Sequence, residues 1–258
     1  MGNPPMSLFS LTCIAGISVF AAGLAAPAAA VEITLFSSNA VKEAYAELIP
    51  EFEKESGHRV NVVWGGTLDL KGRIGRGEMA DVIVTPAADI DDMIKLGTVA
   101  QGSRVDIARS IVGVAVRANL PKPDISSGEK FKSALLASKS IIISGGPSGY
   151  YLLGLFEKQG ILGALRPKMK QLPSGASVGE ALARKEGDIG FTQVSEFLAI
   201  KGINYVGPLP ADVQQVTVFS SGILKNAKQP DAAKELVKFL VGAESISVLK
   251  KTGLEPST

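Results

Sequence analysis

Five short polar loops in this sequence each follow an apolar run that is typical of a β-strand. The most pronounced is SGGPSG, which lies between KSIIIS and an apolar helical pattern. A helix that begins in such a loop has unpaired backbone N–H groups near the positive end of its dipole, and small residues let an anion approach them closely. The loops therefore indicate an anion-binding site. They are SSNA (37–40), GGTLD (65–69), SGGPSG (144–149), SGAS (174–177) and the strand end at Thr192 and Gln193.

A single loop of this type has a simpler interpretation, because Ser, Thr, Asp and Asn are the preferred N-cap residues of helices. The indication of a site comes from the whole set, which the predicted fold places on both sides of one cleft. A nucleotide is a poor candidate for the ligand. Residues 144–149 are not followed by the Lys-Ser/Thr of a P-loop, and no G-x-G-x-x-G follows the first strand.

Few side chains in this sequence are suited to metal binding or nucleophilic catalysis. The chain has one cysteine, Cys13, and one histidine, His58, which falls between a predicted helix end and the start of a strand. A zinc site of the usual His/Cys type is therefore strongly disfavoured, and a Ser-His-Asp triad would need His58 in the pocket. We expect His58 to be structural or exposed, and we predict neither a metal nor a cofactor.

The first 30 residues differ from the rest of the chain. They contain no Asp, Glu, Lys or Arg, and their apolar run ends in APAAA, with Ala28 and Ala30 spaced as an A-x-A cleavage site. This pattern predicts a signal peptide over residues 1–30, cleaved before Val31; a retained membrane anchor is the alternative. We expect a periplasmic protein with no stable membrane insertion after cleavage. A net charge of +2 without a basic tract disfavours nucleic acid as a partner.

After residue 30, strand-type apolar runs alternate with helical patterns. This alternation predicts an α/β fold with mostly parallel sheets flanked by helices. Two longer apolar runs, 106–118 and 213–225, bracket a middle segment with its own alternation. We therefore predict two lobes joined by a two-strand hinge: residues 31–115 plus 218–258, and residues 116–217. Two local predictions are that Pro50 kinks or breaks the first helix and that EFLAIKG (196–202) is helical.

Four segments together resemble the periplasmic molybdate-type solute-binding proteins of ABC transporters. They are EITLFSSNAVKEAYAELIPEFEKESGHRVNV, RGEMADVIVTPA, PSGYYLLGLFEKQGIL and SVGEALARKEGDIGFTQVSE, and they cover nearly all of the chain after residue 30. The resemblance implies a two-lobed type II periplasmic-binding-protein fold and an oxyanion held in the cleft by hydroxyls and backbone amides. It also implies delivery of the ligand to an ABC permease, and we expect the protein to be a monomer.

The resemblance also implies, by position, a set of ligand contacts: Ser38, Asn39, Gly66, Thr67, Ser148, Gly149, Ser177, Val178 and Gln193. Gln193 replaces the family's tyrosine, and Asp69 and Lys71 stand where the second loop is usually neutral. A carboxamide near Lys71, Arg73 and Arg76 suits a larger, planar or multi-carboxylate ligand better than a tetrahedral oxyanion. The predicted ligand is therefore a molybdate-like oxyanion or a small carboxylate.

A sister branch of the same superfamily contains periplasmic aconitate isomerases, and this activity is the alternative function. Moving a proton across an allylic carboxylate needs an acid–base group and cations for the carboxylates. Asp69, Lys71, Tyr150 and Tyr151 are the candidates. Each also has a structural interpretation: Asp69 as an N-cap, Lys71 as part of a solvated helix face, and one tyrosine as part of the core. We expect a binding protein of an ABC importer without chemistry of its own.

Overall fold

The computed structural model describes residues 1–2 and 30–257. The predicted signal peptide therefore lies almost wholly outside the described residues. Within them, no helix combines the length and the apolar character that a membrane crossing requires.

The first lobe is built on a sheet in which β2, β1 and β3 run parallel and β9 joins antiparallel to β3. Every residue of β3 is buried, which is the pattern of a strand covered on both faces. The strands are β1 (Glu32–Ser38), β2 (Arg59–Gly65), β3 (Val82–Pro86) and β9 (Val216–Ile223), and the helices around them are α1 (Lys42–Ser56), α2 (Thr67–Gly75), α3 (Ala87–Lys95), α8 (Pro230–Leu240) and α9 (Ala243–Lys251).

The second lobe has a smaller sheet, in which β5 lies between β6 and β7 and runs parallel to both. Its elements are α4 (Gly128–Ala137), β5 (Ile141–Ile143), α5 (Pro147–Lys158), α6 (Leu162–Leu165), β6 (Met169–Gln171), α7 (Val178–Ala183), β7 (Ile189–Gln193) and β8 (Ile203–Pro208). Short 3-10 turns occur at η1 (Asn39–Val41), η2 (Arg166–Lys168), η3 (Val194–Glu196) and η4 (Ala211–Val213), and a two-residue strand, β10 (Glu255–Pro256), pairs with β4.

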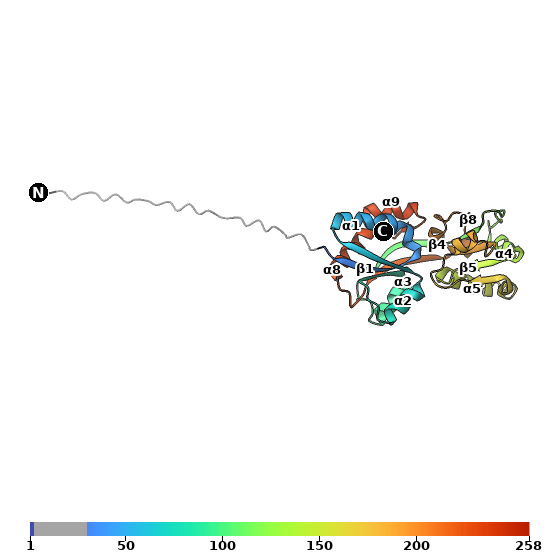
Figure 1. The fold of residues 1–258 in the computed structure, drawn as a ribbon, viewed down its shortest axis with the longest axis horizontal. Coiled ribbons are helices and arrows are strands. Elements are labelled where there is room, and N and C mark those ends of the chain that lie inside the picture. The colour runs from blue at the N-terminus through green and yellow to red at the C-terminus, as the bar shows by residue number, and fades with distance from the viewer. Residues whose placement is uncertain (3–29, 258) are drawn as a thin grey trace.

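One long strand, β4 (Val105–Arg117), runs from the first lobe into the second (Figure 1). It pairs with β9 up to Ile111 and with β7 from Val112 onward. The chain returns beside this point, where the Gln214 side chain accepts a hydrogen bond from the Val112 N–H (2.9 Å) and donates one to its carbonyl (3.1 Å). Separate clusters of buried apolar side chains fill the two lobes. This arrangement confirms the predicted two-lobed α/β fold.

Pro50 does not break the first helix, so that part of the prediction was wrong. α1 runs without interruption from Lys42 to Ser56. Pro50 and Ala46, whose carbonyl loses its usual N–H partner, are both exposed. The opposite face buries Tyr45, Leu48 and Phe52 in the core of the lobe. Each such side chain contributes about 1.5–3 kcal/mol, which together outweighs the cost of about 3 kcal/mol for an interior proline.

The predicted helix over residues 196–202 is also absent. The chain forms the single turn η3 and then non-helical turns, and Gly202 has a left-handed φ of 82°. Val194, Ser195 and Phe197 are buried, whereas Leu198 is exposed. This compact turn keeps Glu196 close to the carboxyl end of β7. The second long apolar run is likewise shorter as a strand, Val216–Ile223.

Candidate functional site

A small cavity of about 30 Å³ lies where the polar loops of the two lobes meet. The first lobe contributes the ends of β1 and β2, the start of α2 and one residue of β9; the second contributes the start of α5, the loop before α7 and the end of β7. The lining residues are Ser38, Asn39, Gly65, Gly66, Thr67, Ser144, Gly146, Pro147, Ser148, Gly175, Ala176, Gln193, Glu196 and Phe219. This position, outside the carboxyl ends of parallel strands, is the usual place for a ligand in open α/β sheets.

The two lobes touch directly at this cavity. The Asn39 side chain donates a hydrogen bond to the Gly175 carbonyl over 2.9 Å. A Cβ atom on Gly175 would lie 2.7 Å from the Gly66 nitrogen, and one on Gly66 would overlap Ser174 and Gly175. Gly175 also has a left-handed φ of 87°. The lobes are therefore in a closed arrangement that depends on glycine on each side.

Two helices begin at the cavity, one from each lobe. α2 has Gly66 as its N-cap and α5 has Gly146, and neither helix has a side-chain cap. The partial positive charge at these N-termini favours an anion. The hydroxyls of Thr67 and Ser148, both in the first turns of these helices, belong to buried residues and supply further donors. No Lys or Arg is among the lining residues, so any anion bound here is held by dipoles and hydrogen bonds.

Glu196 is the one ionisable side chain among the residues that line the cavity. The Thr192 hydroxyl donates a hydrogen bond to its Oε2 over 2.8 Å. Desolvation by burial raises the pKa of Glu196 to about 7, although the Thr192 hydrogen bond acts in the opposite direction. The carboxyl group is therefore suited to accept and return a proton near neutral pH.

Gln193 supplies a second polar group that points to a ligand. The residue is buried, and its Nε2 donates to the Thr217 hydroxyl over 3.3 Å. Its Oε1 is buried without a hydrogen-bond partner among the described residues. Whichever way the amide is turned, one of its two polar atoms is left without a hydrogen-bond partner from the part of the chain that the structure describes.

The ligand contacts implied by the resemblance divide into two groups. Six of them line the cavity: Ser38, Asn39, Gly66, Thr67, Ser148 and Gln193. The other three do not. Gly149 packs against the Ser144 carbonyl, the Ser177 hydroxyl caps α7 by accepting from the Glu180 N–H over 3.2 Å, and Val178 is in an apolar cluster of the second lobe.

Sequence reasoning missed several lining residues, of which Glu196 matters most chemically. The available signal was an acid three residues beyond the end of a predicted strand, but the expected helix over 196–202 obscured it. Phe219 was also missed. The remaining lining residues lie inside the loops that the sequence indicated, although they were not among the individual contacts implied by the resemblance: Gly65, Ser144, Gly146, Pro147, Gly175 and Ala176.

The residues considered for proton transfer lie outside this lining. Asp69 is in the first turn of α2 and pairs with Arg73 over 3.2 Å; the N-cap is Gly66, so the expectation of an Asp69 N-cap was wrong. Lys71 forms an ion pair with Asp89 over 2.6 Å, so its ammonium group is not free in solvent. Tyr150 is exposed.

Two other side chains named from the sequence have structural contacts. The buried His58 accepts a hydrogen bond from the Val31 N–H over 3.3 Å, and its Nε2 lies 3.4 Å from Glu235. The Tyr151 hydroxyl donates to the Val213 carbonyl over 2.9 Å. No group of three His, Cys, Asp or Glu side chains within the described residues is arranged to hold a metal ion.

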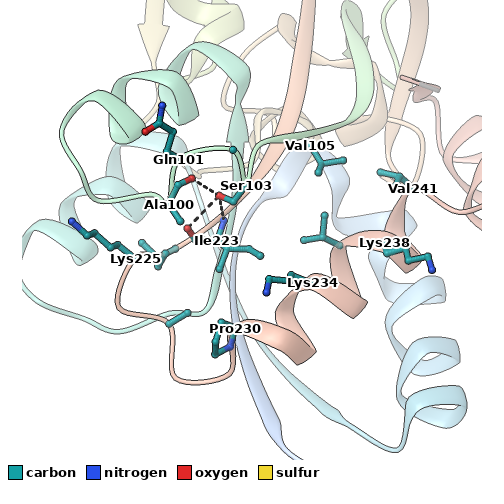
Figure 2. A pocket seen from close by; sticks show the side chains of 14 residues that line it. Ala100, Gln101, Ser103, Val105, Ile223, Lys225, Pro230, Lys234, Lys238 and Val241 are labelled. Carbon is teal, nitrogen blue, oxygen red and sulfur yellow. Dashed lines mark hydrogen bonds between the residues drawn. The ribbon is translucent and has the colours of Figure 1, made fainter.

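A larger cavity, of about 630 Å³, lies elsewhere in the first lobe, between the loop at residues 100–103, the end of β9 and α8 (Figure 2). Its walls include Ile223, Val237 and Val241, with lysines near its edge. Ile223 pairs with the start of β3, whereas Phe219 of the small cavity pairs with its end. The larger cavity is therefore at the opposite end of these strands and has none of the polar loops.

Comparisons with known proteins agree with this geometry. Residues 33–255 match the family described as bacterial extracellular solute-binding protein. An aconitate isomerase of a Pseudomonas species is 31% identical over 230 residues, which cover 87% of each chain. A putative ABC transporter substrate-binding lipoprotein of Bacillus subtilis is 24% identical over 231 residues, 86% of each chain.

The fold comparison points the same way. The periplasmic molybdate-binding protein of Azotobacter vinelandii matches with a TM-score of 0.74 at 19% identity, over 86% of this chain and 98% of that one. The predicted resemblance to the superfamily is confirmed: the chain belongs to the bacterial extracellular solute-binding protein family.

Proposed function

We propose that this protein is a periplasmic receptor that binds a small organic carboxylate between its lobes and delivers it to an ABC permease. The observation that carries the proposal is the chemistry of the cavity: two helix N-termini and several hydroxyls, with Glu196 as the one ionisable side chain of the lining. Family membership supports the role in transport. The same membership and the predicted signal peptide support the periplasmic location.

The presence of Glu196 favours an organic carboxylate over a tetrahedral oxyanion. Molybdate presents acceptor oxygens in all directions, so an ionised Glu196 repels it. An organic carboxylate can place its anionic group at a helix N-terminus and turn a C–H or hydroxyl group toward Glu196. A cavity of about 30 Å³ has room for about two water molecules, so a six-carbon ligand requires lobes that are further apart than in this closed arrangement.

We propose that the lobes, residues 31–115 plus 218–258 and residues 116–217, move about the crossing point of the chain. This point is marked by the change of partner in β4 between Ile111 and Val112 and by the Gln214 hydrogen bonds to Val112. Hinged closure around a ligand is a common motion of two-lobed receptors. The closed form would be the one that a permease recognises.

A second candidate function is the interconversion of cis- and trans-aconitate. Two observations favour it: the relative named aconitate isomerase at 31% identity, and the carboxyl group in the cavity whose pKa lies near 7. Moving the double bond of aconitate requires the transfer of one proton between two carbons, which a single carboxyl group can perform. Under this candidate the same cavity binds the substrate, and the protein is an enzyme.

A thermal-shift comparison of residues 31–258 tests the proposed ligand class. The protein is heated with cis-aconitate, trans-aconitate, citrate, succinate, molybdate, tungstate or sulfate at matched ionic strength. A ligand at 100 times its Kd adds about 2.7 kcal/mol of stability. We expect one or more carboxylates to raise the Tm and the tetrahedral anions to leave it unchanged. Stabilisation by the tetrahedral anions alone, or by no carboxylate, contradicts the proposal.

A further inference from the structure

Glu196 is the only side chain of the cavity lining that can exchange a proton near neutral pH. We propose that Glu196 is the catalytic acid–base residue that carries the proton between two carbons of bound aconitate. This inference rests on the second candidate function, because it needs a substrate whose double bond moves.

The position of Glu196 satisfies the first requirement, access to a bound ligand. The residue ends η3, directly after the strand whose last residue is Gln193, and both residues line the cavity. η3 belongs to the second lobe and lies against η1 of the first lobe. The carboxyl group is therefore at the junction that forms when the lobes close, where a ligand held by both helix N-termini would be within reach.

The second requirement is that one carboxyl oxygen is held in place while the other is free to contact the ligand, and the hydrogen bonding of Glu196 satisfies it. The Thr192 hydroxyl donates to Oε2 over 2.8 Å. Oε1 has no hydrogen-bond partner among the described residues, so it is available to a ligand. Thr192 is itself fully buried on β7, which makes it a rigid anchor and assigns it the role of a positioning residue.

The environment of Glu196 satisfies the third requirement, a proton affinity matched to the task. Burial raises its pKa to about 7, so the ionised and protonated forms are present in similar amounts at neutral pH. Such a group can remove a proton and return it without a large penalty in either direction. No Lys or Arg in the lining lowers this pKa, and Asp69 and Lys71 are held in ion pairs with Arg73 and Asp89.

The reaction balances with this residue alone. Ionised Glu196 removes a proton from the CH₂ carbon of aconitate: the C–H bond breaks, an O–H bond forms, and the electron pair spreads over the three-carbon unit and its carboxylates. Protonated Glu196 then gives the proton to the other terminal carbon, and the pair returns as the shifted double bond. The negative charge that develops on the carboxylates is stabilised by the N-termini of α2 and α5. No oxidant, reductant or water is consumed.

The substitution Glu196→Gln tests the inference, since it keeps the size and polarity of the side chain and removes the acid. Interconversion of cis- and trans-aconitate is followed by NMR in D₂O, which also records deuterium entering the CH₂ group. We expect kcat to fall by about 10²-fold or more, while trans-aconitate binding measured by calorimetry changes by less than about fivefold. Glu180→Gln is the matched control, because Glu180 is exposed and pairs with Arg184.

Each outcome of this experiment supports or overturns the inference. If Glu196→Gln does not fold, Glu196→Asp replaces it; the shorter acid should retain the pH dependence of turnover at a lower kcat. If Glu196→Gln turns over at the wild-type rate, another group transfers the proton; this result overturns the inference but not the isomerase function. Aconitate binding without turnover or deuterium entry in the wild type removes the isomerase function but leaves the receptor. Absence of any carboxylate binding in the wild type removes the proposed function as well.

Discussion

At the scale of single residues, the cavity, as the described residues line it, is an anion site without cationic side chains and with a single acid, Glu196. Thr67, Ser148 and the backbone amides of two helix N-termini offer hydrogen-bond donors, whereas Glu196 and the amide of Gln193 can also accept. A site of this kind discriminates between an anion that presents only acceptor oxygens and one that also carries C–H or hydroxyl groups. It also makes binding depend on the protonation of Glu196.

Anion affinity should therefore fall as the pH rises through about 7. Below this value Glu196 is mainly protonated and can donate to the ligand; above it, the ionised carboxylate repels the anion. We predict that the Kd for trans-aconitate, measured by calorimetry, increases about fivefold between pH 6 and pH 8, which corresponds to about one pKa unit of coupling. Glu196→Gln should remove most of this change. An equal pH dependence in the variant would show that the ligand or another group titrates instead.

Ser148 provides a second prediction at this scale. It is 1% exposed and lies in the first turn of α5. A hydrogen bond to a charged group contributes about 1.5–3 kcal/mol, so Ser148→Ala should weaken carboxylate binding about 10- to 100-fold with little change in the Tm of the free protein. Ser133→Ala serves as the control, because Ser133 is exposed on α4 and bonds only within its helix. Unchanged affinity in Ser148→Ala would remove this hydroxyl from the site.

At the scale of elements, tertiary packing decides where local sequence signals fail. α1 continues through Pro50 because its apolar face is buried in the first lobe. Replacing this proline by alanine should restore the missing backbone hydrogen bond without removing any core contact. We predict that Pro50→Ala stabilises the protein by about 1–3 kcal/mol, measured as the free energy of unfolding in urea. No gain in stability would mean that the proline contributes packing or restricts the unfolded chain to a similar extent.

The elements also show how far sequence reasoning extends here. The buried strands and the long helices follow from hydrophobic periodicity, and so do the polar loops, because loops after parallel strands meet at one edge of a sheet. The individual contacts Ser38, Gly66 and Ser148 came from the resemblance to the family. The short elements β6, α6 and β10 span too few residues to show a period. Glu196 was missed because its segment has a helical pattern, whereas the structure has only the single turn η3 there. Spacing alone also does not separate a capping serine such as Ser177 from a ligand-binding one.

At the scale of the whole molecule, function depends on how closely the two lobes approach. Their contact is made by Gly66 and Gly175, and the hydrogen bond from Asn39 to Gly175 crosses between them. A six-carbon ligand must separate these glycines, and it then lies between the two lobes that carry them. A side chain at either glycine would keep the lobes from approaching, so the affinity of the site depends on glycine at both positions.

The measurement that tests the central claim most directly is a calorimetric titration of wild-type protein, Gly66→Ala and Gly75→Ala with trans-aconitate and with molybdate. A Cβ atom on Gly66 overlaps the second lobe, whereas one on Gly75 in the same helix meets no atom within 4 Å. The account predicts that trans-aconitate binds the wild type and Gly75→Ala with similar affinity. It should bind Gly66→Ala about tenfold or more weakly, because Gly66 lines the cavity and a methyl group there takes up space that the ligand needs, at a packing cost of about 1–3 kcal/mol. Binding of molybdate but not of aconitate, or equal aconitate affinity in Gly66→Ala, would contradict a carboxylate site between the lobes.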